Sequence, residues 1–167
     1  MRKLLRYLVP YKLPIIFIIA LVFIQSLSEL FLPTLMSDII DKGVINQDIP
    51  YIWKIGGFML LVAALGTICS ITASYLSAKV SMSFGKNLRS RVFSHVENFS
   101  LHEFEQVGTA SLITRTTNDV TQVQVVLNMI LRMMIMAPLM AIGGIIMAFS
   151  KDPELSWVII LAIPVLV

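Results

Sequence analysis

Hydrophobic residues fill three long stretches of the chain that are almost free of charge. The first stretch covers residues 13–37 and contains one charged residue, Glu29, whereas the stretches 55–78 and 133–150 contain none. Each stretch reaches the roughly 18–20 residues that an α-helix needs to cross a bilayer core of ~30 Å. The pattern predicts three membrane-spanning helices, TM1 to TM3. A fourth apolar stretch, residues 155–167, is too short to span, so we interpret it as the start of TM4 and the sequence as a fragment truncated in that helix.

The helical pattern continues past the second apolar stretch. Apolar positions recur mostly every four residues at Val80, Phe84, Leu88, Val92, Val96 and Phe99. A second stripe, with alternating spacings of three and four, follows at Ile113, Thr116, Val120, Val123, Leu127 and Ile130, a spacing typical of a seam against another helix. We therefore predict that TM2 (55–78) continues to about residue 99 and that TM3 spans about 110–150. A single helix over 55–99 is about 65 Å long, so that more than ~20 Å of it leaves the bilayer.

The turn between these two long helices has its own signals. Ser100 and Glu103 fit a capping box at the start of a short helix over 101–107. Gly108 suits the position after its end, where a left-handed conformation is needed. Leu101, Phe104 and Val107 recur every third residue on one face of that helix. The simpler interpretation is an ordinary turn between two helices. We favour an interaction element, because a turn needs only a few residues.

Composition and charge support a membrane location. Hydrophobic residues make up 57% of the 167 residues and charged residues 14%, which is well below the charge of soluble domains. Nine basic residues lie in segments 1–12 and 79–119, against three in the other two connections. By the positive-inside rule this places the N-terminus and the 79–119 segment in the cytosol. Segment 1–12 is expected to be an amphipathic elbow at the inner surface. No basic face of the kind that binds nucleic acid is indicated.

Three residues of the apolar stretches are candidates for a substrate cavity. Glu29 lies well inside TM1, where a carboxylate is expensive unless it faces water or a partner. Met133 and Met136 carry flexible side chains suited to an adaptable pocket. The alternatives are a solvated carboxylate for Glu29 and ordinary core packing for the methionines.

Several local patterns resemble those of the transmembrane domain of ABC exporters. They are PTLMS at 33–37 followed by IIDKG at 39–43, SLITR at 111–115 followed by TNDVTQ at 117–122, and Pro138 with Gly143 and Gly144. The likeness covers nearly the whole chain, and segment 112–120 is its most specific part. It is greatest to one half of bacterial heterodimeric multidrug exporters.

The resemblance implies an all-α, polytopic bundle of the ABC transporter type 1 exporter fold, with long helices extending into the cytosol. A complete half then has six membrane helices followed by a nucleotide-binding domain, and two halves, identical or different, form the transporter. Helix 101–107 matches the first coupling helix, which docks on a nucleotide-binding domain of the same or the partner half. The residues expected at that interface are Leu101, Phe104, Glu105 and Val107.

The sequence contains no G-x-x-x-x-G-K-[ST] phosphate-binding loop. We assign no catalytic, cofactor-binding or metal-binding residue to this chain, and its hydrolytic role is left open. The resemblance implies ATP and Mg on the missing nucleotide-binding domain, which in the full-length relative is an ATP-hydrolysing translocase.

The function predicted from these observations is that of a membrane-domain segment of an ATP-driven exporter for lipophilic compounds, drugs or lipids. Its expected partners are the lipid bilayer, a nucleotide-binding domain, a second transporter half and a lipophilic substrate. The expected location is the bacterial plasma membrane, as a multi-pass protein with a cytoplasmic N-terminus. The alternative is a membrane sensor or scaffold that signals through its cytosolic helical hairpin.

Overall fold

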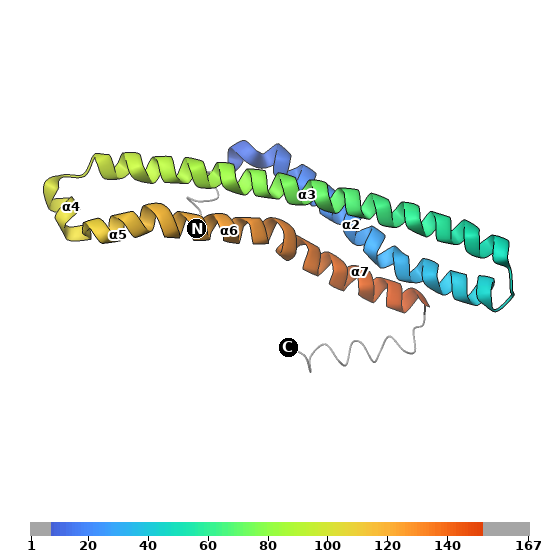
Figure 1. Ribbon diagram of the computed structural model, residues 1–167. Coiled ribbons are helices and arrows are strands. Elements are labelled where there is room, and N and C mark those ends of the chain that lie inside the picture. Colours follow the sequence, from blue (N-terminus) through green and yellow to red (C-terminus); the bar gives the residue numbers. More distant parts are fainter. Residues whose placement is uncertain (1–7, 152–167) are drawn as a thin grey trace. The chain divides into compact units, whose positions relative to one another are not determined.

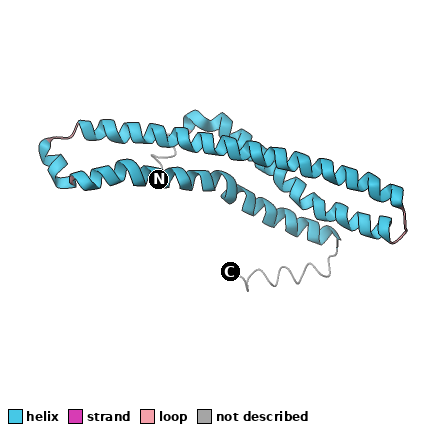
Figure 2. Cartoon of the chain, in the orientation of Figure 1, coloured by secondary structure: helices cyan, strands magenta, loops and turns pink. Residues whose placement is uncertain are grey.

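The computed structural model of the protein describes residues 8–151, and all regular elements in this range are helices (Figures 1 and 2). Part of the predicted elbow, residues 1–7, and the predicted start of TM4, residues 155–167, lie outside the described residues. The elements in chain order are η1 (Val9–Tyr11), α2 (Lys12–Asp38), η2 (Ile39–Val44), α3 (Ile49–Glu97), α4 (Leu101–Val107), α5 (Thr109–Thr114), η3 (Arg115–Asp119), α6 (Val120–Met129), η4 (Ile130–Met134) and α7 (Ile135–Lys151).

Three helical segments are long and apolar enough to cross a membrane. They cover Val9–Val44, Ile49–Glu97 and Thr109–Ser150. Large apolar side chains on them are exposed, among them Leu60 at 73% and Ile71 at 65%. Exposure of this kind is unfavourable in water but is expected where lipid surrounds a helix. The prediction of an all-α, polytopic membrane protein is confirmed.

The chain forms two compact units. The bundle unit consists of residues 20–72 and 134–151, and the hairpin unit consists of residues 8–19 and 73–133 within the described range. Both α2 and α3 contribute residues to both units.

Small residues allow the helices of the bundle unit to approach closely. A methyl group added to Gly66 of α3 would lie 3.0 Å from Cβ of Ser28 in α2. A methyl group on Gly143 of α7 would overlap the side chain of Leu30. Close approach over small residues is typical of helices packed within a membrane, where van der Waals contact replaces the hydrophobic driving force.

Four hydroxyls of the bundle unit are satisfied within their own helices. Ser26 donates to the carbonyl of Val22 (2.9 Å), and Thr72 donates to that of Ile68 (2.8 Å). Ser28 and Thr67 also donate to the carbonyl four residues earlier. None of these four side chains needs a partner from another helix to pair its hydroxyl hydrogen.

The hairpin unit is built on the stripe predicted in α3. Val80 and Phe84 are buried, and Leu88, Val92, Val96 and Phe99 are half-buried. The stripe therefore faces the interior of this unit. Beyond its end, α4 joins α3 to α5 at the tip of the hairpin (Figure 1).

The second predicted stripe needs a correction at both ends. Val120 and Leu127 are buried as predicted, but Ile113 and Ile130 are 59% and 41% exposed, and Leu112 and Leu131 are buried instead. The reason is the π-helical geometry of η3 and η4, which flank α6. A π turn uses more residues per turn than an α turn, so the inward-facing positions move by one residue on either side of α6.

Candidate functional site

Helix α4 is a seven-residue helix held by a complete capping box, which confirms the predicted signal. The Ser100 hydroxyl accepts a hydrogen bond from the Glu103 backbone N–H at 3.3 Å. The Glu103 carboxylate in turn accepts from both the backbone N–H and the hydroxyl of Ser100, each at 2.8 Å. The local sequence thus pairs donors that the first turn of a helix leaves unpaired.

Gly108 ends α4 with a positive φ. Its φ of 77° is a value that residues with a side chain avoid, as the sequence predicts. Its ψ of 140° differs from the compact left-handed conformation that we expected. The chain therefore leaves α4 in an extended conformation that only glycine adopts readily, and α5 starts at once with Thr109.

The same capping box sets the ionisation of Glu103. Hydrogen bonds from the backbone N–H of Ser100, and then from its hydroxyl, favour the carboxylate and hold the pKa of Glu103 below its ordinary value of 4.5. The carboxylate is exposed. It also lies in the first turn of α4, where a negative charge is favourable to the helix.

The faces of α4 differ in exposure. Phe104 and Val107 are half-buried, whereas His102, Glu105 and Gln106 are exposed. The structure does not describe the side chain of Leu101. The exposed face carries a contact between the His102 ring and the Gln106 amide at 3.0 Å. Three of the four residues expected at an interface therefore have described side chains, and Glu105 is the most accessible of them.

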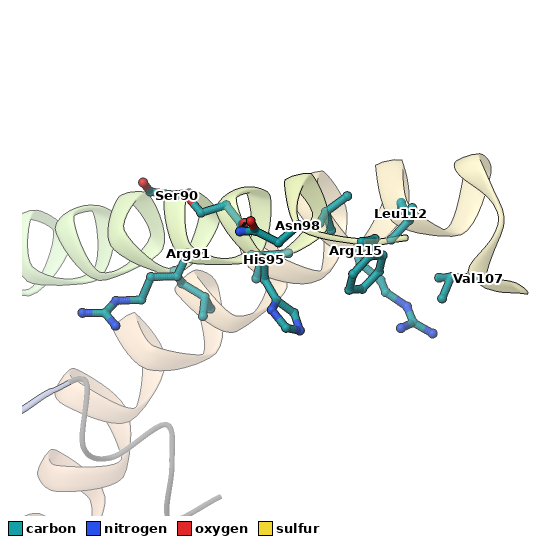
Figure 3. Close-up of a pocket in the computed structure, with 12 residues that line it drawn as sticks. Ser90, Arg91, His95, Asn98, Val107, Leu112 and Arg115 are labelled. Atoms are coloured by element: carbon teal, nitrogen blue, oxygen red, sulfur yellow. Dashed lines mark hydrogen bonds between the residues drawn. The ribbon is translucent and has the colours of Figure 1, made fainter. Parts of the chain in front are cut away.

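An open cavity of about 660 Å³ lies beside the ends of the two long helices of the hairpin. Its lining combines apolar residues such as Val96, Phe99 and Leu112 with the basic side chains of Arg91 and Arg115. Val107 of α4 lies at one end of the cavity and Arg91 at the other (Figure 3). Helix α4 thus contributes one of its predicted interface residues to this cavity as well.

A row of polar contacts joins α3 to the η3–α6 segment. The Ser77 hydroxyl, completely buried, donates to the Asn128 side chain at 2.6 Å. Further along, a methyl group added to Gly85 would lie 2.6 Å from Oε1 of Gln124. Arg89 then donates to the carbonyl of Thr116 at 3.2 Å. We call the hydrogen bonds from Ser77 and from Arg89 the polar seam, and Gly85 between them is a position of close approach.

The polar seam was not predicted from the sequence. A faint signal exists, because Ser77, Ser81, Gly85 and Arg89 recur every four residues on α3. Their partners lie 27 to 51 residues away in the sequence, and no local rule identifies such pairs. Ser81 is also buried, and its hydroxyl has no hydrogen-bond partner among the described residues.

The residues predicted for a substrate cavity are not brought together by the described contacts. Glu29 is half-buried in α2 and accepts a hydrogen bond from the Gln25 side chain at 2.9 Å. Met133 is 65% exposed in the hairpin unit, and Met136 is half-buried in the bundle unit. The bundle unit holds an apolar cavity of about 520 Å³, which includes Phe31, Val62 and Gly143, but neither Glu29 nor Met136 lines it.

No group of three or more potential metal ligands occurs within residues 8–151.

Comparison with known proteins identifies the family. Residues 15–167 match the ABC transporter transmembrane region. The chain therefore belongs to this family, as the resemblance seen in the sequence implies.

Individual relatives agree with this assignment. An ABC transporter ATP-binding protein of Mycobacterium tuberculosis is 36% identical over 94% of this chain and 27% of its own length. The ABC transporter ATP-binding protein YfiB of Bacillus subtilis is 36% identical over the whole chain and 29% of its own length. A Rickettsia typhi protein named an export ATP-binding/permease protein is 27% identical over 98% of this chain and 28% of its own length. The chain thus spans less than a third of the relatives that it matches.

Proposed function

We propose that this chain is the N-terminal part of the membrane domain of an ATP-driven exporter and that α4 is its first coupling helix. The observation that carries the proposal is a short, fully capped helix at the tip of a long hairpin, in a chain of this family. The names of relatives that mention export and ATP binding support the direction and the energy source. Family membership also favours the exporter over a membrane sensor or scaffold.

In this mechanism α4 receives the movement of a nucleotide-binding domain, which holds ATP and Mg, and the hairpin passes it on. A relay of this kind requires helices that move as one body. The polar seam supports this requirement, because hydrogen bonds from Ser77 and Arg89 fix the register of α3 against the η3–α6 segment. Alternation between inward-open and outward-open states then follows from ATP-driven movement of the hairpin.

The proposed contact surface of α4 consists of Leu101, Phe104, Glu105 and Val107. Phe104 is its central residue, since a large aromatic side chain that enters a partner's pocket dominates interface energy. Its partial exposure leaves part of the ring available to a partner. Glu105 is exposed and suits the polar rim of such an interface.

The test is made in the full-length transporter. Phe104→Ala is expected to leave ATP binding intact and to lower the amount of substrate transported per ATP hydrolysed about tenfold or more, the effect of losing a central interface residue. The measurement is transport and ATPase activity in the same proteoliposomes. His102→Ala is the matched control, because His102 is exposed on the same helix but outside the proposed surface. Unchanged coupling in a correctly assembled Phe104→Ala transporter would reject the role of α4.

The proposed orientation has α4 in the cytosol and the turn between α2 and α3 outside. With Cys69 replaced by Ala, single cysteines at Asp48 and His102 are expected to react with a membrane-impermeant maleimide from opposite sides. In sealed right-side-out vesicles only the Asp48→Cys protein is labelled. Labelling of both positions from outside would overturn this orientation.

For the substrate we propose a lipophilic compound, drug or lipid, and for the assembly a second transporter half. Glu29, Met133 and Met136 are the residues that we propose for the cavity wall. Glu29 is half-buried and its carboxylate accepts a hydrogen bond from an uncharged amide, and we propose it as the contact for a cationic substrate. The proposed cellular location is the plasma membrane of a bacterium.

A further inference from the structure

The hairpin unit has a second cleft, which the proposed function does not involve. This cleft has a volume of about 470 Å³ and lies between α3 and the η3–α6 segment. Two basic residues, Lys86 and Arg89, line it together with two large apolar residues, Met82 and Phe93. The remaining lining residues are Ser90, Thr116 and Gln124, so that no acidic residue is among those that form it.

The basic groups in the cleft differ in how they are held. Arg89 is anchored, because its guanidinium donates to the Thr116 carbonyl at 3.2 Å and reaches the Thr121 hydroxyl at 3.4 Å. Lys86 is exposed, and its ammonium group has no hydrogen-bond or ion-pair partner within residues 8–151. A fixed guanidinium and a free ammonium in the lining of one cleft make a site of two positive charges that suits an anion.

The two large apolar side chains of the cleft are also exposed. Met82 is 63% and Phe93 is 55% exposed. A site that combines two cationic groups with exposed apolar side chains suits an amphiphile with an anionic head better than a small hydrophilic anion.

The position of the cleft along α3 points to the source of such an amphiphile. The predicted span of TM2 ends at residue 78, and Met82 lies four residues, or about 6 Å of helix rise, beyond it. The headgroup layer extends about 5–8 Å from the hydrocarbon core. Lys86 lies about 12 Å beyond the span, but helical side chains lean toward the N-terminus of their helix, and this brings its ammonium back toward the headgroups.

We propose that this cleft binds the headgroup of an anionic phospholipid from the inner leaflet. The lipid phosphate lies between Lys86 and Arg89, and its glycerol and upper acyl carbons contact Met82. Bound there, the lipid touches both long helices of the hairpin, because the cleft is lined from α3 and from the η3–α6 segment. The inference rests on the proposed cytosolic orientation of the hairpin but does not depend on coupling through α4.

The experiment counts lipids retained by the full-length transporter. The protein is purified in neutral detergent without ATP, titrated with phosphatidylglycerol or phosphatidylcholine, and analysed by native mass spectrometry. Lys86→Gln is expected to weaken phosphatidylglycerol retention about fivefold, the contribution of one basic residue at an anionic surface. Lys86→Arg is expected to retain the lipid like the wild type. Arg115→Gln is the matched control, because it removes the same charge from the hairpin but lines the other cavity.

Each contrary outcome rejects the proposal in a different way. Equal retention by Lys86→Gln and the wild type would show that Lys86 does not hold the lipid and would reject the cleft as its site. Equal losses in Lys86→Gln and Arg115→Gln would reduce the effect to net charge. Displacement of the lipid by millimolar inorganic phosphate would make it a site for free phosphate. None of these measurements uses ATP or transport. A negative result for the lipid proposal is therefore distinct from a negative result for coupling through α4.

Discussion

The bundle unit and the hairpin unit hold their helices together by different means. In the bundle unit, small residues such as Gly66 and Gly143 let helices touch, and Phe31 packs edge-on against Phe58 with ring centres 6.5 Å apart. The hairpin unit also has a buried apolar stripe, but it adds hydrogen bonds between helices, from Ser77 to Asn128 and from Arg89 to Thr116. Among the described residues, side-chain hydrogen bonds between long helices occur in the hairpin unit and not in the bundle unit.

The two kinds of contact determine how each unit responds to a substitution. Apolar helices in lipid gain little from burial itself, so their association depends on how closely the backbones approach. Helices joined by hydrogen bonds have a defined register, because each donor must meet its own acceptor. A unit of the first kind is sensitive to added volume, and a unit of the second kind is sensitive to the loss of a partner. The following predictions test that distinction.

The largest effect is expected from added volume in the bundle unit. Gly66→Leu places a side chain where Cβ of Ser28 already lies 3.0 Å from the position of a first methyl group. We expect it to destabilise the protein by about 2–3 kcal/mol, the cost of overpacking. The measurement is the midpoint of SDS-induced unfolding in mild detergent.

Gly57→Leu is the matched control, because no atom lies within 4 Å of a methyl group added at that position of α3. Both substitutions raise helix propensity equally, so that the difference between them isolates packing. If the two variants unfold at the same midpoint, close approach at Gly66 contributes nothing.

A smaller effect is expected from removing one partner of the polar seam. Asn128→Leu leaves the buried Ser77 hydroxyl without its acceptor, and we expect a loss of about 1 kcal/mol in the same assay. The double variant Ser77→Ala/Asn128→Leu is expected to recover part of that loss, because no buried hydroxyl is then left unpaired.

Asn118→Leu is the control for this pair. It is the same substitution as Asn128→Leu, but Asn118 is exposed and lies outside the polar seam. If the double variant loses more unfolding free energy than the two single variants lose together, the pairing of Ser77 with Asn128 is contradicted.

The smallest effect is local and depends on pH. The pKa of Glu103 is lowered in the folded protein, so its contribution to the cap of α4 is present above the ordinary pKa of 4.5 and is lost as the pH falls through the lowered value. Cleavage within residues 101–107 by pepsin is therefore expected to accelerate as the pH falls below 4.5 and through the lowered pKa of Glu103.

Glu103→Gln is the control for the pH effect, because glutamine keeps the hydrogen bond but does not titrate. Ser100→Ala, which removes the cap, is expected to increase cleavage at every pH by weakening the helix by about 1 kcal/mol. Equal acceleration in the Glu103→Gln protein would show that acid acts elsewhere.

Features that depend on residues close together in the sequence could be predicted, whereas those that depend on distant residues could not. The capping box spans four residues, from Ser100 to Glu103, and the structure confirms it. The stripe of α3 is a regular helical repeat, and it faces inward as expected. The second stripe was wrong at Ile113 and Ile130, because simple periodicity assumes a uniform helix and the π segments η3 and η4 are not uniform. The polar seam was missed because Ser77 and Asn128 are 51 residues apart.

The hydroxyls that bond within their own helix bear on how the protein enters a membrane during synthesis. Ser26, Ser28, Thr67 and Thr72 each donate to a carbonyl one turn earlier, so each can pass into hydrocarbon without waiting for a neighbouring helix. Ser77 is different, since its acceptor on Asn128 leaves the ribosome 51 residues later. These four hydroxyls are thus prepared for separate insertion of their helices, whereas the Ser77 pair closes only after Asn128, which precedes the third apolar stretch, has been made.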